Sequence, residues 1–280
     1  MEVKFIFLLI HSRDDIGNLT KREQSMKVKC FICDEMIEGE SVDVLTDILM
    51  IHGREKHLWN YPEEAARTYV CNYVEAVERL TGDTVRKDEI GEVTISPVTA
   101  DSIDDWLQFF DHDAFVGNPD WADCYCLEPH IPPTADNPVR PWRENRLIMV
   151  ERFSKGKAYG YLAYLDGRPV GWVNASLRSD YGLFQQIDPD GPEPSSIIGI
   201  SCFIIAPPYR RHGIASALLD HVIEDAATRG ALWIEGYPRN QSQSTDAAHF
   251  RGSQSMYIKR GFKPVVVREK DTVMRLQVHH

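Results

Sequence analysis

The chain is 280 residues long, with 43% hydrophobic residues, 26% charged residues and a formal net charge of −11. This composition is typical of a globular protein with a substantial core, and the length allows two domains. The acidic balance argues against nucleic acid as a partner, and no apolar stretch is long enough to span a membrane. Six cysteines are too few for a disulfide framework at this length, so we expect a reducing, cytoplasmic location.

Residues 1–25 contain the apolar run FIFLLI near the start of the chain. The run is short, and the polar segment HSRDD follows it in place of a small-residue cleavage site, so it does not predict a signal peptide. Because Met26 opens the next segment, we interpret residues 1–25 as a loose extension or a mis-assigned start. We assign them no function.

Residues 26–82 are predicted to form a small domain with two helices. The first helix covers about Val42 to His57, and the second begins at Pro62, a residue favoured in the first helical turn. Apolar residues recur in the second helix at intervals of three and four, and Gly82 ends it. The polar, glycine-flanked residues 83–92 are interpreted as a linker.

Two cysteines and two histidines in this domain have the spacing of a metal site. Cys30 and Cys33 are separated by two residues, and His52 and His57 are predicted to lie about one turn apart at the end of a helix. These are four ligands of the kind that bind structural Zn²⁺ as a tetrahedron. The arrangement resembles small bacterial metal-binding domains joined to other units; free thiols and surface histidines are the alternative.

The zinc-finger-like domain is too acidic to bind DNA. Between Met26 and Glu92, eight Lys and Arg residues stand against fifteen Asp and Glu residues. Phosphate backbones would repel such a surface. We therefore expect a structural zinc, and leave a homodimer contact or protein docking open as added roles.

Residues 93–278 are predicted to form a second domain of the α/β (α+β) class, with a mixed central sheet flanked by helices. The order is strand, helix, loop, hairpin, buried strand, helix, strand, helix and hairpin, and the first hairpin turns at Asp166–Gly167. The segments that carry this pattern are 93–98, 102–110, 158–177, 196–205, 213–230, 231–237 and 262–278.

The turn between the buried strand and the following helix has the composition of an anion site. A helix that starts near Gly213 leaves backbone N–H groups free, and these suit a phosphate group. Gly213 and Ala215 keep side chains out of the way, so a diphosphate can approach the backbone. Arg210, Arg211 and His212 add positive charge to an otherwise acidic chain.

The R-x-x-G-x-A motif at residues 210–215 resembles the acetyl-CoA pyrophosphate motif of the GCN5-related N-acetyltransferases (GNAT). The later strand, the Y-x-x-x-G-F motif at residues 257–262 and the final hairpin follow in the order that this family shows. The resemblance covers about residues 92–278. It implies the GNAT fold and an N-acetyltransferase in which a primary amine attacks acetyl-CoA directly in a ternary complex.

The resemblance also implies roles for particular residues. Tyr257 would give a proton to the CoA sulfur, and Glu235 would act as a base through water; a core tyrosine and a salt-bridged glutamate are the alternatives. A backbone N–H in the strand around Phe203–Ile205 would stabilise the oxyanion. Phe250 stands where the family often has an asparagine, so no polar side-chain contact is expected there. The expected cofactor-binding residues are Phe203, Ile204, Ile205, Arg210, Arg211, His212, Gly213, Ile214 and Ala215.

The acceptor side is expected to come from the proline-rich loop before the first hairpin and from that hairpin. The pattern W-x-x-C-Y-C at residues 121–126 is similar to a loop found in a subset of GNAT proteins. The spacing of Cys124, Cys126 and His130 leaves open whether they bind metal or form a pocket wall. The expected substrate-binding residues are Trp121, Tyr125, Trp172 and Asn174.

Three functions fit the sequence. The first is acetylation of a small-molecule amine. The second is acetylation of a protein lysine or N-terminus, with the zinc domain as docking module, and the third is a non-catalytic CoA-binding sensor. A closed acceptor pocket favours the first function and an open groove the second, while the acyl group and the amine stay undetermined.

Overall fold

The computed structural model describes residues 25–240, 245 and 247–279, so the expectation for residues 1–25 lies almost entirely outside the described residues. The helices are α1 (Val42–His57), α2 (Glu63–Arg79), α3 (Ile103–Gln108), α4 (Trp142–Ser154), α5 (Ile214–Asp225) and α6 (Gln254–Ile258). The strands are β1 (Met26–Lys29), β2 (Met36–Gly39), β3 (Val93–Pro97), β4 (Gly160–Leu165), β5 (Arg168–Leu177), β6 (Ile197–Ile205), β7 (Trp233–Gly236), β8 (Lys263–Val267) and β9 (Thr272–Gln277). Within the described residues, no helix is both long and apolar enough to cross a membrane.

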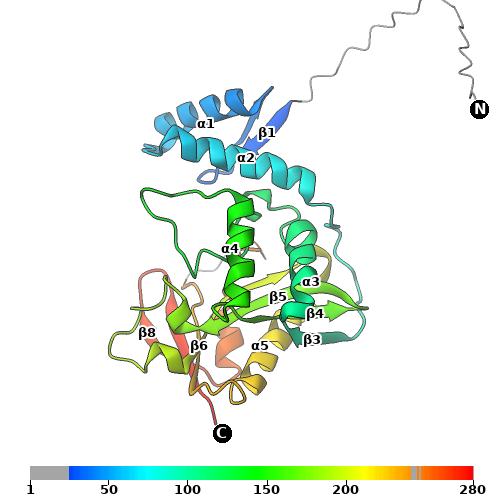
Figure 1. Cartoon of the computed structure of the whole chain (residues 1–280), viewed down its shortest axis with the longest axis vertical. Coiled ribbons are helices and arrows are strands. Elements are labelled where there is room, and N and C mark those ends of the chain that lie inside the picture. Colours follow the sequence, from blue (N-terminus) through cyan, green and yellow to red (C-terminus); the bar gives the residue numbers. More distant parts are fainter. Residues whose placement is uncertain (1–24, 241–244, 246, 280) are drawn as a thin grey trace, which may run out of the picture.

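The elements β1, β2, α1 and α2 form one layer at one end of the molecule, which we call the N-terminal unit (Figure 1). β1 and β2 pair antiparallel, with Met26 opposite Gly39. The Ser41 hydroxyl caps α1 by accepting from the Val44 N–H at 3.2 Å, as expected at a helix start. Both helices were predicted, but the sequence analysis missed the strands, because four residues each is too short for a pattern.

The rest of the chain builds a seven-stranded sheet in the order β3-β4-β5-β6-β7-β9-β8. Neighbouring strands in this sheet are antiparallel except for β6 and β7, which run parallel. The predicted hairpin turn is confirmed at Asp166 and Gly167, whose φ angles of 50° and 76° suit a two-residue turn. The mixed sheet flanked by helices confirms the predicted α/β class.

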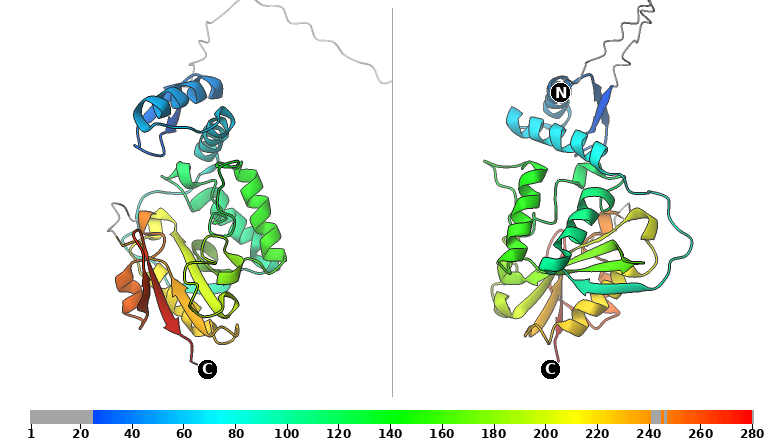
Figure 2. Two further views of the ribbon diagram at one scale, coloured as in Figure 1. Left: turned by 90° about the vertical axis from the view of Figure 1, so that its left-hand side faces the viewer. Right: turned by 45° about the vertical axis from the view of Figure 1, so that its right-hand side comes forward.

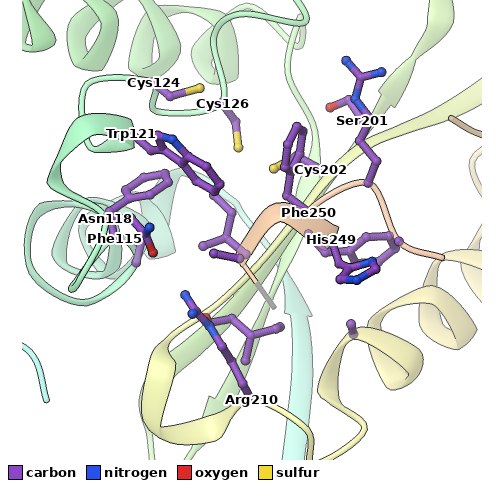
Figure 3. A pocket seen from close by; sticks show the side chains of 18 of the residues that line it. Phe115, Asn118, Trp121, Cys124, Cys126, Ser201, Cys202, Arg210, His249 and Phe250 are labelled. Carbon is purple, nitrogen blue, oxygen red and sulfur yellow. The ribbon is translucent and has the colours of Figure 1, made fainter. Parts of the chain in front are cut away.

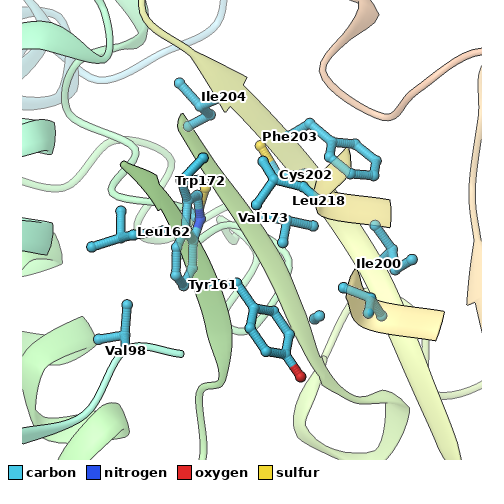
Figure 4. Close-up of a cluster of buried hydrophobic side chains, with 14 of the residues drawn as sticks. Val98, Tyr161, Leu162, Trp172, Val173, Ile200, Cys202, Phe203, Ile204 and Leu218 are labelled. Carbon is cyan, nitrogen blue, oxygen red and sulfur yellow. The ribbon is translucent and has the colours of Figure 1, made fainter. Parts of the chain in front are cut away.

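Helices cover both faces of this sheet (Figures 1 and 2). On one face the Trp172 ring of β5 packs edge-on against Trp106 of α3 and Phe153 of α4, at centroid distances of 6.0 and 5.9 Å. On the other face Tyr161 of β4 packs against His221 of α5 at 4.8 Å. Figure 4 shows Trp172 and Tyr161 in the core together with side chains of β6.

The sheet opens between β6 and β7. Their pairing runs from Ile197 opposite Trp233 to Ile200 opposite Gly236, and there β7 ends. β6 continues to Ile205, paired on its other side with β5. Beyond Ile200 the edge of β6 that faced β7 is therefore open to other partners.

The sequence analysis also missed α4, which lies in the stretch between the proline-rich loop and the first hairpin. Its apolar residues include four in a row, Leu147 to Val150, rather than residues spaced by three and four. Met149 is fully buried while Leu147 is 64% exposed. Such a helix lacks the periodic apolar stripe on which a sequence prediction depends.

The N-terminal unit packs on the sheet domain through α2. The Arg79 guanidinium donates to the carbonyl oxygens of Phe110, Asp111 and Ala122 at 3.0 to 3.1 Å. The Arg79 side chain also lies over the Trp142 ring at 4.5 Å. α2 is thereby attached to the loop that precedes α4 and to the end of α3.

Candidate active site and metal centre

A cavity of about 760 Å³ lies where the sheet opens (Figure 3). Its walls are the open part of β6, the turn before α5, the loop around residues 114–129 and the segment 247–256. The volume is in the range of pockets that hold cofactors and small ligands. The structure thus brings together the predicted turn and the predicted acceptor loop.

Nearly all of the expected cofactor-binding residues line this cavity. Gly213 caps α5 with φ of 81°, and a Cβ placed on it would meet no atom within 4 Å. Arg211, two positions before Gly213, also has a positive φ, of 68°, so the turn folds back sharply before the helix. The members that line the cavity are Phe203, Ile204, Ile205, Arg210, Arg211, Gly213, Ile214 and Ala215.

His212 is the exception among them. Its Nε2 atom lies 2.8 Å from the carbonyl oxygen of Lys87, in the segment that joins the N-terminal unit to β3. The Lys87 N–H in turn donates to the Pro208 carbonyl oxygen at 2.9 Å. His212 therefore contacts the connecting segment and does not line the cavity, so the geometry does not support the expectation that it binds the cofactor, which stays a prediction.

Tyr257 lies directly behind the cavity wall. It is fully buried, and its hydroxyl donates to the Arg251 carbonyl oxygen at 3.0 Å. Its ring packs against Gly252, which lines the cavity and has no side chain to separate the two. Burial, with the nearby Cys202, raises the pKa of Tyr257 far above its usual value, so the phenol keeps its proton.

Glu235 does not reach the cavity. It is fully buried and forms ion pairs with Arg178 at 3.2 Å and with Arg275 at 2.6 Å. The Tyr237 hydroxyl donates to its second oxygen at 3.1 Å. A carboxylate held by two guanidinium groups is a structural ion pair, so the expectation of a base at Glu235 is not supported by the geometry.

Three of the expected substrate-binding residues belong to the core. Tyr125 is fully buried, and its hydroxyl donates to Asp111. Trp172 packs among the rings of α3 and α4, as described above. Asn174 is also fully buried and accepts from the Tyr181 hydroxyl at 2.8 Å. Of the four residues expected, only Trp121 lines the cavity, where its ring meets that of Phe250 at 6.2 Å.

The open edge of β6 already has one partner. The Phe203 N–H donates to the carbonyl oxygen of Phe250, so it is not free to serve as an oxyanion donor here. Cys202 and Cys126 both line the cavity and lie beside one another (Figure 3). His130 does not converge with the cysteines on a metal site, because its ring contacts Asn174 at 3.1 Å and the Asp180 carbonyl oxygen at 3.0 Å.

Sequence reasoning did not single out the acidic residues that line the cavity. Among the described residues these are Asp120, Asp123 and Glu128, all within the loop that carries Trp121. Burial raises the pKa of Asp123 to about 6, because desolvation outweighs its hydrogen bond from Asn72. In the sequence these carboxylates look like ordinary loop residues.

The four predicted metal ligands converge in the N-terminal unit. The ligand atoms of Cys30, Cys33, His52 and His57 all lie within 4.8 Å of one another. The His52 Nε2 atom is 3.3 Å from Cys33 Sγ and 3.2 Å from His57 Nε2. A zinc tetrahedron has edges of about 3.3–3.8 Å, given Zn–N near 2.0 Å and Zn–S near 2.3 Å. The donor set and spacing therefore fit zinc.

The local fold explains why these ligands meet. Cys30 and Cys33 sit on the turn between β1 and β2, and the Asp34 N–H donates to the Cys30 carbonyl oxygen at 2.9 Å. The Trp59 ring lies so close to Gly53 that a Cβ there would fall 2.2 Å from it. That contact folds the chain after α1 back onto the helix end that carries the two histidines.

The family model described as "Acetyltransferase (GNAT) family" matches residues 120–262, just over half of the 280 residues. The chain belongs to the GNAT acetyltransferase family. It is therefore an acyltransferase that uses acetyl-CoA, and its seven-stranded sheet is the GNAT fold that the sequence motifs predicted.

Solved structures of the GNAT family are similar at low identity. A putative acetyltransferase from Desulfovibrio desulfuricans is 14% identical, covers 67% of this chain and 100% of its own, and has a TM-score of 0.42. The PaiA N-acetyltransferase from Thermoplasma acidophilum, in complex with coenzyme A, is 13% identical over 67% of this chain and 99% of its own, with a TM-score of 0.42. The search of curated proteins gave no match.

Proposed function

We propose that this GNAT enzyme transfers the acetyl group of acetyl-CoA to the primary amine of a small molecule. The proposal rests on two contacts between the N-terminal unit and the loop of residues 118–128, which forms one wall of the cavity. Lys29 and Asn72 of the N-terminal unit contact Asp120 and Asp123, two cavity residues of this loop, at 2.9 and 3.1 Å. The N-terminal unit thus backs the acceptor wall, which suits a small molecule better than a protein lying in an open groove.

Acetyl-CoA is proposed to enter from the turn before α5. The diphosphate would lie against the backbone of residues 210–215, where the helix start offers N–H groups and the arginines add charge. The pantetheine arm would follow the open edge of β6 towards Cys202 and Phe203. Its amides could then pair with strand backbone that β7 no longer covers.

The reaction requires one bond to form and one to break. The amine nitrogen attacks the thioester carbonyl carbon, the C–S bond breaks, and the electron pair leaves on sulfur. An ammonium acceptor gives up two protons in total, and one of them ends on the departing thiolate. We propose that the Tyr257 hydroxyl donates a hydrogen bond to that sulfur in place of its hydrogen bond to the Arg251 carbonyl, and that the proton which the thiolate receives comes from the acceptor nitrogen. Cys202 needs no covalent role in this direct transfer.

Zinc is proposed as a structural ion held by Cys30, Cys33, His52 and His57. When bound, it would cross-link the β1–β2 turn to the end of α1, and it would take no part in acyl transfer. Thiol ligands persist in a reducing compartment, and all six cysteines are free. This supports the proposed cytoplasmic location.

A thiol-release assay tests the proposed function. The protein is incubated with acetyl-CoA and, in separate reactions, small primary amines, peptides or proteins; N-acetylated products are identified by mass spectrometry, and CoA binding is measured by calorimetry. We expect thiol release that depends on both substrates, with one acetyl group gained by the amine. Release only with peptides or proteins would support the docking-module alternative, and tight CoA binding without release on any acceptor would support the sensor.

A further inference from the structure

In the loop of residues 118–128, which we call the acceptor wall of the cavity, one carboxylate oxygen has no hydrogen-bond partner among the described residues. The Asp120 side chain is 6% exposed and lines the cavity. Its Oδ2 atom lies 2.9 Å from Lys29 Nζ, while no hydrogen-bond donor among the described residues reaches the buried Oδ1 atom. Leaving a buried carboxylate oxygen without a donor is costly, and a cationic group that entered the cavity and reached this atom would relieve that cost.

Asp123 supplies a second carboxylate to the same wall. Its Oδ2 atom accepts from the Asn72 amide at 3.1 Å, and Asp123 also lines the cavity. The charged and titratable groups that face it are Asp120 on its own loop, with its partner Lys29, and Arg79 and Tyr69 on α2. Desolvation raises the pKa of the adjacent, partly buried Cys124 thiol well above its usual value, so this thiol stays neutral.

We propose that Asp120 and Asp123 bind the ammonium group of the acceptor, and that Asn72 is a positioning residue that holds Asp123 from the N-terminal unit. This inference rests on the proposed function and names its substrate class: a cationic primary amine without a carboxylate beside the amino group. Lys29 provides an example of the proposed interaction, because its ammonium group forms an ion pair with the Oδ2 atom of Asp120.

The surroundings of the two carboxylates favour this class. Trp121, Phe115 and Phe250 line the same cavity and offer apolar and aromatic surface to the body of the amine. The Arg251 guanidinium, which also lines the cavity, pairs through Nη1 with Asp271 at 3.2 Å. A carboxylate placed beside the amino group would be repelled by Asp120 and Asp123.

Binding as an ammonium also provides a route for the first proton. Once the ammonium is seated, Asp123 accepts one proton from it and leaves the nitrogen lone pair free to attack the thioester. Asp123 can do this only when it is ionised, and the rise of its pKa towards neutrality makes it a better proton acceptor than an exposed carboxylate. Asn72 donates to the ionised form and so keeps the accepting oxygen in place.

The first test uses the unmodified protein and a matched pair of probes. 2-Phenylethylamine and L-phenylalanine share a ring and a primary amine and differ by one carboxylate. Their binding is measured by calorimetry with CoA present, where no transfer can occur. We expect 2-phenylethylamine to bind at least tenfold more tightly. Equal binding, or tighter binding of phenylalanine, would overturn the proposed class.

The second test uses variants with matched controls. Asp120→Asn and Asp123→Asn should each weaken 2-phenylethylamine binding at least tenfold, and Asn72→Ala about fivefold, with CoA affinity changed less than twofold. Asp136→Asn removes a charge from an exposed site on the following loop, and Asn60→Ala removes an exposed amide from the connection between α1 and α2. Both should bind 2-phenylethylamine as the wild type does.

The outcomes distinguish failure of the proposed ammonium site from failure of the proposed function. Unchanged amine binding in folded Asp120→Asn and Asp123→Asn contradicts the ammonium site, whatever the turnover. Weakened amine binding in these variants, without thiol release from any amine, supports the site and contradicts the proposed function. If one aspartate variant does not fold, the other variant and the probe pair still decide.

Discussion

The Asn72 amide nitrogen of α2 lies 3.1 Å from the Asp123 carboxylate, 51 positions later in the chain. The same nitrogen donates to the Arg140 carbonyl oxygen at 2.8 Å, and the Asn72 oxygen accepts from the Trp142 N–H at 3.0 Å. One buried side chain thus fastens the N-terminal unit to the acceptor loop and to the start of α4.

This contact predicts a pH dependence for the reaction. Asp123 must be ionised to accept a proton, so kcat/KM for the amine should fall as the pH drops below about 6. Asn72→Asp removes the donor and adds a like charge, and both effects favour protonated Asp123. We expect the acidic limb of the profile to move up by about one pH unit.

The control for this prediction is Asn60→Asp, which adds the same charge at an exposed position of the N-terminal unit. It should leave the profile within a few tenths of a pH unit of the wild type. If Asn72→Asp leaves the pH profile unchanged, Asp123 is not the proton acceptor.

His130 predicts how stability depends on pH. Burial, and then the Arg152 charge, lowers its pKa to about 3, so the folded protein holds it neutral. An unfolded chain would bind a proton at about 6.5. Between these values the unfolded state binds the extra proton, so this contribution to stability is lost as the pH falls from about 6.5 towards 3.

His130→Gln should therefore reduce the slope of unfolding free energy against pH by up to about 1.4 kcal/mol per unit between pH 4 and 6. Urea unfolding at several pH values measures this slope. Asp123, with its raised pKa, acts with the opposite sign between about 4 and 6, so the comparison must be made between wild type and variant. An unchanged slope would mean that His130 is protonated in the folded protein.

The parts of the site that could be predicted from the sequence are those that are contiguous or repeat a fixed spacing. The turn at residues 210–215 and the set Cys30, Cys33, His52 and His57 are of this kind, and the structure brings each together. Asp120 and Asp123 could not be found in this way. Their role depends on burial by α2, which a loop sequence does not reveal.

Some aromatic and acidic residues were predicted in the site, but the structure places them outside the cavity. Trp172 and Tyr125 were expected in the acceptor pocket, but both belong to the core. The residue type alone does not distinguish an aromatic side chain in a pocket from one in a core. Glu235 stands on the strand where a base was expected, and only the positions of Arg178 and Arg275 show that it is held in ion pairs. Long-range partners decide such cases.

Tyr257→Phe should lower kcat about 10²-fold and change the KM for acetyl-CoA less than twofold, because the hydroxyl acts when charge develops on sulfur. Tyr237→Phe is the matched control, since it also removes a buried hydroxyl that donates a hydrogen bond. Steady-state kinetics of both variants separate the two cases. Equal kcat losses would assign Tyr257 to the core alone.

The metal site predicts one zinc per chain by elemental analysis. Cys33→Ser should reduce the zinc content below a tenth of an equivalent, whereas Cys71→Ser, on α2 and outside the cluster, should keep it. A unit of this size has a small core, so zinc loss should lower the temperature at which it unfolds. Full zinc content in Cys33→Ser would show that the ion is bound elsewhere.

The most direct test of the account is calorimetric titration of acetyl-CoA into two glycine variants. Gly213 and Gly230 both have positive φ, and a Cβ on either would meet no atom within 4 Å, so aspartate strains the backbone equally at the two positions. Gly213→Asp should weaken binding at least tenfold, or about 1.4 kcal/mol, because it places bulk and negative charge at the proposed diphosphate site. Gly230→Asp should bind as the wild type does. Wild-type affinity in folded Gly213→Asp would contradict the placement of acetyl-CoA, and with it the geometry from which the acceptor site is argued.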